Sequence, residues 1–147
     1  MIQPHSTSAQ AQVLNTMIGL TYLSNLQRAI IAGGDGMELY LGLRYRGFMR
    51  VVTVSTYWTP RRQHAIGLIA DRGSPESVKR ALAEISPFLC TNATVAVLTD
   101  SRGSSSSLEV RTKLQQMGFQ IEAGVRCQQG LVLCAHRQGF IDMKNAA

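Results

Sequence analysis

Apolar residues follow two different spacings along this chain, and the spacings change at regular intervals. Residues 8–28 place apolar side chains at the i, i+3, i+4 spacing of an amphipathic helix, and residues 37–46 form a second helical segment that Gly47 ends. Short apolar runs that are typical of buried strands stand at 29–32, 50–55, 65–70 and 93–99. The first half of the chain therefore predicts helix, strand, helix and strand in turn.

The second half continues the alternation and closes with a hairpin. Ser74 is a predicted helix cap, followed by Pro75 in the first turn, and Pro87 ends that helix. A further helix is predicted over 108–117, and residues 104–107, four consecutive serines, are expected to form a flexible loop with the last serine as a cap. Alternating and apolar runs at 119–123 and 131–135 predict a closing antiparallel pair.

This order of elements predicts an α/β fold, a three-layer α/β/α sandwich built on a Rossmann-like, mostly parallel sheet with a C-terminal antiparallel hairpin. In such sheets, ligands bind outside the carboxyl ends of the strands, near the point where the strand order reverses. We expect the loops that follow the strands to share one edge of the sheet. These loops are 32–36, 55–58, 71–74 and 99–102.

The glycine-rich segment after the first strand is the clearest candidate for a ligand site. Gly33, Gly34 and Gly36 permit a positive φ and let a ligand approach bare backbone, and the N–H groups that open the next helix attract anions. Asp35, between these glycines, could contact a ligand or cap the helix. Gly33 to Gly36 are therefore expected to form a loop of the size that binds phosphate or ribose groups.

Asp71 is the best catalytic candidate because a carboxylate at the carboxyl end of a buried strand, inside a cleft, can act as a general base. The alternative is a turn aspartate that accepts hydrogen bonds from the amides of Gly73 and Ser74. His64 is expected at the opposite end of its strand and His136 at the end of the hairpin, so no arrangement of histidine with serine and aspartate is predicted.

Composition narrows the class of protein. With 147 residues, 45% apolar and 16% charged, the chain fits one domain, 1–147, with tails at 1–7 and 138–147 that we expect to be flexible. No apolar run approaches the length that spans a bilayer, and the first residues lack the pattern of a signal peptide, so we expect a cytoplasmic protein without membrane contact.

Charge and cysteine usage exclude further classes of function. A net charge of +6 favours anionic partners, but the arginines are dispersed and do not alternate with aromatic residues, so nucleic-acid binding is not expected. The pair Arg61 and Arg62 is expected in a solvated loop. Three cysteines without a C-x-x-C spacing favour buried thiols over a disulfide framework or a metal site.

From 14 to 136, the order of elements resembles the class I S-adenosylmethionine-dependent methyltransferases. The segment Ala32-Gly-Gly-Asp-Gly36 is similar to the Gly-Gly-Gly-Asp-Gly loop of spermidine synthase-like members, with Ala32 in place of the first glycine. The final hairpin is more specific, because most other doubly wound folds lack it. The resemblance implies that Gly33, Gly34, Asp35 and Gly36 hold the methionine part of S-adenosylmethionine.

The resemblance also implies roles for residues at the next two strand ends. Ser55 or Thr56 would hold the ribose where family members usually carry an acidic residue, and Asp71 with Arg72 would face the adenine or the substrate. Tyr57 and Trp58 could stack on the adenine or cover the sheet. Compared with the family pattern, the resemblance implies that the third strand and the helix after it are compressed into 56–63.

Two functions follow from this resemblance. The first is binding of S-adenosylmethionine or a related nucleoside, with methyl transfer to a substrate that the sequence does not name. The second is a degenerate, non-catalytic domain that keeps the scaffold and serves assembly, as a homodimer or as a subunit of a larger complex.

Overall fold

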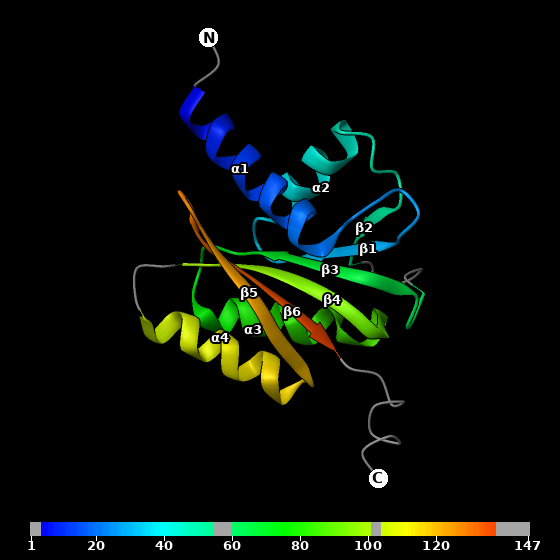
Figure 1. Ribbon diagram of the computed structural model, residues 1–147, viewed down its shortest axis with the longest axis vertical. Helices are drawn as coiled ribbons and strands as arrows, with labels where there is room; N and C mark the ends of the chain where they lie inside the picture. The colour runs from blue at the N-terminus through cyan, green and yellow to red at the C-terminus, as the bar shows by residue number, and fades with distance from the viewer. Residues whose placement is uncertain (1–3, 55–59, 101–103, 138–147) are drawn as a thin grey trace.

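A computed structural model describes residues 4–54, 60–100 and 104–137 of the chain, with the side chains of 4–8 and 104–106 left aside. Within these ranges six strands form one sheet in the order β2-β1-β3-β4-β6-β5. Neighbouring strands are parallel from β2 to β4, and β6 is antiparallel to both β4 and β5. Two helices cover each face, as Figure 1 shows, so the predicted three-layer α/β/α sandwich with a closing antiparallel hairpin is confirmed.

The elements alternate along the chain as predicted, with different bounds at several ends. The helices are α1 (Pro4–Thr21), α2 (Gly36–Tyr45), α3 (Pro75–Ile85) and α4 (Ser104–Gln116), and a 3-10 turn, η1 (Ser86–Phe88), follows α3. The strands are β1 (Ala29–Ala32), β2 (Val51–Thr53), β3 (His64–Ala70), β4 (Leu89–Thr99), β5 (Phe119–Cys127) and β6 (Gly130–Arg137).

Helix α1 ends at Thr21, well before the predicted end at residue 28. Tyr22 takes a left-handed backbone conformation with φ of 55°, and the Leu23 amide donates to the Ile18 carbonyl at 3.2 Å. This is the 6→1 hydrogen bond of a Schellman cap. Leu23 is buried although it lies beyond the helix. The helical spacing of apolar residues therefore continued past the true end, and no glycine marked that end in the sequence.

The serines at 104–107 belong to the first turn of α4, so the predicted flexible loop with a cap at Ser107 is wrong. The first N–H groups of a helix have no partner inside the helix, and serine is well tolerated at such positions. The prediction weighed the turn preference of serine and missed this role.

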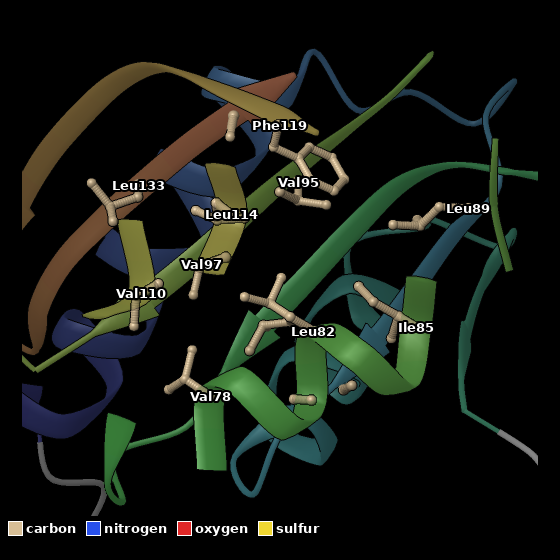
Figure 2. Close-up of a cluster of buried hydrophobic side chains, with 14 of the residues drawn as sticks. Val78, Leu82, Ile85, Leu89, Val95, Val97, Val110, Leu114, Phe119 and Leu133 are labelled. Carbon is tan, nitrogen blue, oxygen red and sulfur yellow. The ribbon is translucent and has the colours of Figure 1, made fainter. Parts of the chain in front are cut away.

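The sheet separates two apolar layers because successive residues of a strand point to opposite faces. On one face, α3 and α4 pack on the sheet through Leu82, Ile85 and Leu114, which are fully buried (Figure 2). On the other face, α1 and α2 pack through residues that include Met17 and Leu43. Ile30 of β1 faces the first layer, whereas its neighbour Ile31 faces the second.

The three cysteines are free, and only Cys134 is buried. Cys90 and Cys127 are half-buried, so the prediction of buried thiols is wrong for these two. Burial raises the pKa of the Cys134 thiol to about 11.

Among the described helices, none is long and apolar enough to cross a membrane.

Candidate functional site

Two loops meet at the carboxyl edge of the sheet, at the point where the strand order reverses. β1 has β2 on one side and β3 on the other, and this reversal is where α/β sheets bind ligands. The loop after β1 contains Gly33, Gly34 and Asp35, and the loop after β3 contains Asp71 and Arg72. The expectation that these strand ends share one edge is confirmed for the described residues.

Gly33 packs its backbone directly against the end of β3. Its φ is 103°, and a Cβ atom added there would lie 2.3 Å from the Ala70 carbonyl oxygen. Only glycine fits a backbone that is both left-handed and this close to another strand. The predicted need for glycine after β1 therefore holds at this position.

The Asp71 carboxylate bridges the two loops. Its Oδ1 accepts from the Gly73 amide at 2.8 Å, one of the two amides that the turn interpretation predicted, and its Oδ2 accepts from the Gly34 amide at 3.0 Å. The contact with Gly34 was not predicted. Asp71 thus combines the geometry of a turn aspartate with a position beside the glycine loop. Ser74 caps α3 as predicted, with its side chain accepting from the Ser77 amide.

Asp35 bonds the opposite loop instead of its own helix. It occupies the cap position of α2 without a capping hydrogen bond from its side chain, so the predicted capping role is wrong. Its backbone, at φ −102° and ψ 14°, is not in the extended conformation that capping side chains use. Its Oδ2 accepts from the Arg72 amide at 2.8 Å, and its own amide donates to the Ala70 carbonyl at 2.9 Å.

Arg72 lies across the two acidic residues of the first loop and α2. Its Nε is 4.0 Å from Asp35 Oδ2, and its Nη2 is 3.7 Å from Glu38 Oε2. All three side chains are at least partly exposed, so these ion pairs add little to the free energy of unfolding. They place one guanidinium beside two carboxylates at this edge of the sheet. Glu38 was not predicted as a site residue, although its position one helical turn after Asp35 could have indicated it.

The other predicted site residues fall into three groups. Gly36 begins α2, where it is buried against Ile31. Ser55 and Thr56, like Tyr57 and Trp58, lie outside the described residues. Arg61 and Arg62 are exposed, as predicted for a solvated loop.

His64 and His136, the two histidines whose side chains the structure describes, lie away from the two loops. His64 begins β3 at the opposite end from the two loops, as predicted, and its Nδ1 lies 3.0 Å from the Phe88 carbonyl oxygen. Burial lowers the pKa of His64. His136 Nδ1 lies 3.1 Å from Thr94 Oγ1. Across 4–54, 60–100 and 104–137, no three metal-ligating side chains gather to hold an ion.

Among the cavities in the described part of the chain, two that open beside the loops concern the site. The larger, about 350 Å³, lies on the face covered by α1 and α2 and includes Asp35, Ala70 and Arg72 in its lining. The smaller, about 160 Å³, is lined by Asp71, Arg72, Leu98, Thr99, Asp100 and Gln129. Arg72, Leu98 and Gln129 line both cavities, so the two adjoin each other at these side chains.

No model of a protein family and no curated protein sequence matches the chain. Solved structures do match. A SAM-dependent methyltransferase from Aquifex aeolicus is 12% identical, with a TM-score of 0.59, 88% of this chain and 89% of that chain covered. Precorrin-6y C5,15-methyltransferase from Geobacter metallireducens is also 12% identical, with a TM-score of 0.58 and 86% and 88% covered.

A third match was solved with ligands bound. It is geranyl diphosphate C-methyltransferase from Streptomyces coelicolor in complex with Mg²⁺, geranyl diphosphate and S-adenosyl-L-homocysteine, 8% identical, with a TM-score of 0.61 and 88% and 81% covered. At these identities the likeness concerns the fold. With its sheet order and closing hairpin, the chain has the fold of the class I S-adenosylmethionine-dependent methyltransferases.

Proposed function

We propose that the protein binds S-adenosylmethionine or a related nucleoside at the carboxyl edge of β1 and β3, and transfers its methyl group to an acceptor. The observation that carries this proposal is the meeting of Gly34 and Asp71 at the point where the strand order reverses. The methyltransferase-like fold supports the same position, because the resemblance assigns the methionine part of the cofactor to this glycine loop.

The residues at the loops fit the amino-acid end of the cofactor. The Gly34 amide is a donor and the Asp71 carboxylate is an acceptor, 3.0 Å apart, and Gly34 is exposed. A methionine group carries both an ammonium and a carboxylate, so it complements a neighbouring acceptor and donor. We propose that Asp71 holds the ammonium and that the Gly34 amide turns to the carboxylate.

We propose that the ribose is held by Ser55 or Thr56, which follow β2 in the sequence. A hydroxyl there replaces the acidic residue of the family, which removes a charge-assisted hydrogen bond of about 1.5–3 kcal/mol. We therefore expect weaker binding than an acidic residue would give.

S-adenosylmethionine supplies a methyl group on a sulfonium, and the protein's task is to position an acceptor in line with it. We propose that the acceptor lies in the smaller cavity, which Asp71 lines, and that Asp71 itself holds the cofactor's ammonium and does not act as the general base that the sequence predicted. Arg72, held between Asp35 and Glu38, lies beside the same cavity and would border the acceptor.

Calorimetric titration of the purified protein with S-adenosylhomocysteine, S-adenosylmethionine, NAD and ATP tests the proposal. We expect binding of the two adenosyl compounds that carry an amino-acid end. Asp71→Asn should weaken that binding about tenfold, the loss of about 1.4 kcal/mol when an ammonium meets a neutral acceptor. Glu84→Gln removes a charge from exposed Glu84 on α3 and should bind like the wild type.

Two results would reject the proposal. One is the absence of heat with both adenosyl compounds at millimolar concentration. The other is equal affinity of Asp71→Asn and the wild type, because the amino-acid end would then lie elsewhere.

A second function, assembly with another copy of the chain, is favoured by one observation. Met37, Leu41 and Tyr45 are spaced four residues apart on α2, and all three are exposed, Tyr45 by 94%. Apolar stripes of this kind are typical of interfaces. Light scattering should give the mass of a dimer for the wild type and of a monomer for Tyr45→Glu. If the wild type is monomeric at roughly 100 µM, a concentration in the range of the Kd of a weak dimer, assembly is rejected.

A further inference from the structure

The larger cavity is a built apolar pocket between α1 and α2. Its walls come from Val13 and Leu14 of α1, Leu39 of α2, and Ala70 and Leu98 at the ends of β3 and β4, all buried. Its volume, about 350 Å³, is within the range of pockets that hold small molecules. An organic molecule with an apolar body would gain from this surface.

Gly42 keeps the two helices close beneath the pocket. It lines the cavity on α2, and a Cβ atom there would lie 2.6 Å from Leu14 Cδ1. The two helices therefore pack directly at this point, on the same face of the sheet (Figure 1). The apolar part of the lining comes from helices and strands, whereas Asp35, Arg72 and Gln129 come from the loops at its edge.

The charged groups around the pocket are mostly acidic, in contrast to the chain as a whole. Asp35 and Glu38 line the apolar cavity, and Asp71 and Asp100 line the adjoining one. Within the described part of the chain, Arg72 is the single cation that lines either cavity. Four of the nine acidic residues thus surround these cavities in a protein with fifteen basic residues.

The cation already present leaves net negative charge at the rim. Arg72 contacts Asp35 and Glu38 at 4.0 and 3.7 Å, and Glu38 also accepts from Gln10 Nε2 at 3.0 Å. At the larger cavity, the one guanidinium of Arg72 balances only one of the two carboxylates, Asp35 and Glu38. A ligand with a cationic end gains Coulomb energy here, whereas an anionic one loses it.

We propose that the cavity between α1 and α2 binds a small molecule with an apolar or aromatic body and a protonated amine. The body lies against Leu14, Leu39 and Leu98, and the ammonium lies among the carboxylates near Arg72. This binding goes beyond the proposed cofactor site, since it needs neither S-adenosylmethionine nor residues 55–59.

Titration with three compounds of matched shape tests the proposal. The probes are 2-phenylethylamine, which is cationic at pH 7, the neutral 2-phenylethanol and the anionic 3-phenylpropanoate. We expect the amine to bind about tenfold more tightly than the alcohol, and the acid to bind most weakly. Amide chemical shifts should change on α1 and α2 and not on α4.

Two variants distinguish the effect of a carboxylate at the pocket from the effect of the protein's net charge on amine binding. Glu38→Gln should weaken the amine about threefold to tenfold and leave the alcohol unchanged. Glu84→Gln, at an exposed position on α3 across the sheet, should leave both unchanged. Both side chains are exposed, so neither variant is expected to unfold the protein.

Three outcomes would overturn the proposal. They are no binding of any probe, equal or tighter binding of the alcohol or the acid, and equal effects of Glu38→Gln and Glu84→Gln. Amine binding without binding of S-adenosylhomocysteine would support the pocket while rejecting the proposed cofactor site. The reverse result would keep the cofactor site and reject the pocket.

Discussion

Replacing Gly33 by alanine tests the contact that joins the two loops. The variant places a Cβ on a residue with φ of 103°, which costs about 1–2 kcal/mol for a residue with a side chain. The Cβ would also lie 2.3 Å from the Ala70 carbonyl oxygen, so β1 and β3 must separate locally.

That separation breaks specific hydrogen bonds. The Asp35 amide bonds the Ala70 carbonyl at 2.9 Å, and the Gly34 amide bonds Asp71 at 3.0 Å. Each is worth about 1 kcal/mol. The total loss expected for Gly33→Ala is therefore about 3–4 kcal/mol of unfolding free energy, or about 6–16 °C in Tm for a chain of this size.

Gly34→Ala is the matched control, one residue further along the same loop. Gly34 lies outside the left-handed region, and its added Cβ would meet Asp71 Oδ2 at 3.5 Å, an ordinary contact. Alanine restricts the unfolded chain, so this variant should match the wild type or exceed it by up to about 1 kcal/mol. Urea unfolding followed by circular dichroism measures both. Equal midpoints for the two variants would refute the close approach of the loops.

Three further predictions concern the core. Burial lowers the pKa of His64, so the unfolded chain binds the proton more tightly than the folded one, and the free energy of unfolding should fall as the pH drops below about 6.5. Between pH 8 and pH 5, the urea midpoint should fall less for His64→Gln than for the wild type. An equal fall of the midpoint for both proteins would contradict this. Leu82→Ala should cost about 2–5 kcal/mol of unfolding free energy, because the Leu82 side chain, drawn in Figure 2, is 0% exposed. Leu108→Ala should cost less than about 0.5 kcal/mol, because Leu108 is 64% exposed; equal losses would be inconsistent with this core. Cys134, with its pKa raised to about 11, should react with iodoacetamide at pH 8 far more slowly in the folded than in the urea-unfolded protein by mass spectrometry, and equal rates would count against its burial.

The sequence predicted the parts of the fold that depend on apolar spacing. β1 and β3 are buried almost throughout, so their apolar runs were unambiguous. The end of α1 was missed because Tyr22 takes the left-handed conformation after the helix, at a position where glycine is usual. Ser104 was missed as a helix start because its residue type suits both a loop and a first turn.

The site could be predicted as a position and not as a set of contacts. Gly34 and Asp71 both follow strands of one parallel sheet, which places them at the same edge. Their hydrogen bond depends on side-chain rotamers, and the cavity above them depends on how closely α1 and α2 pack at Gly42. Neither quantity is encoded by a local pattern.

The position of β6 inside the sheet constrains the order in which the protein folds. β6 is the last strand in the described part of the chain, yet it pairs with β4 on one side and β5 on the other. Among the described strands, β5 joins the sheet through β6 alone. During synthesis, β5 leaves the ribosome before the strand that attaches it. The antiparallel edge must therefore close late, and a chain stopped before residue 130 would expose the free edge of β4, which makes it prone to aggregate.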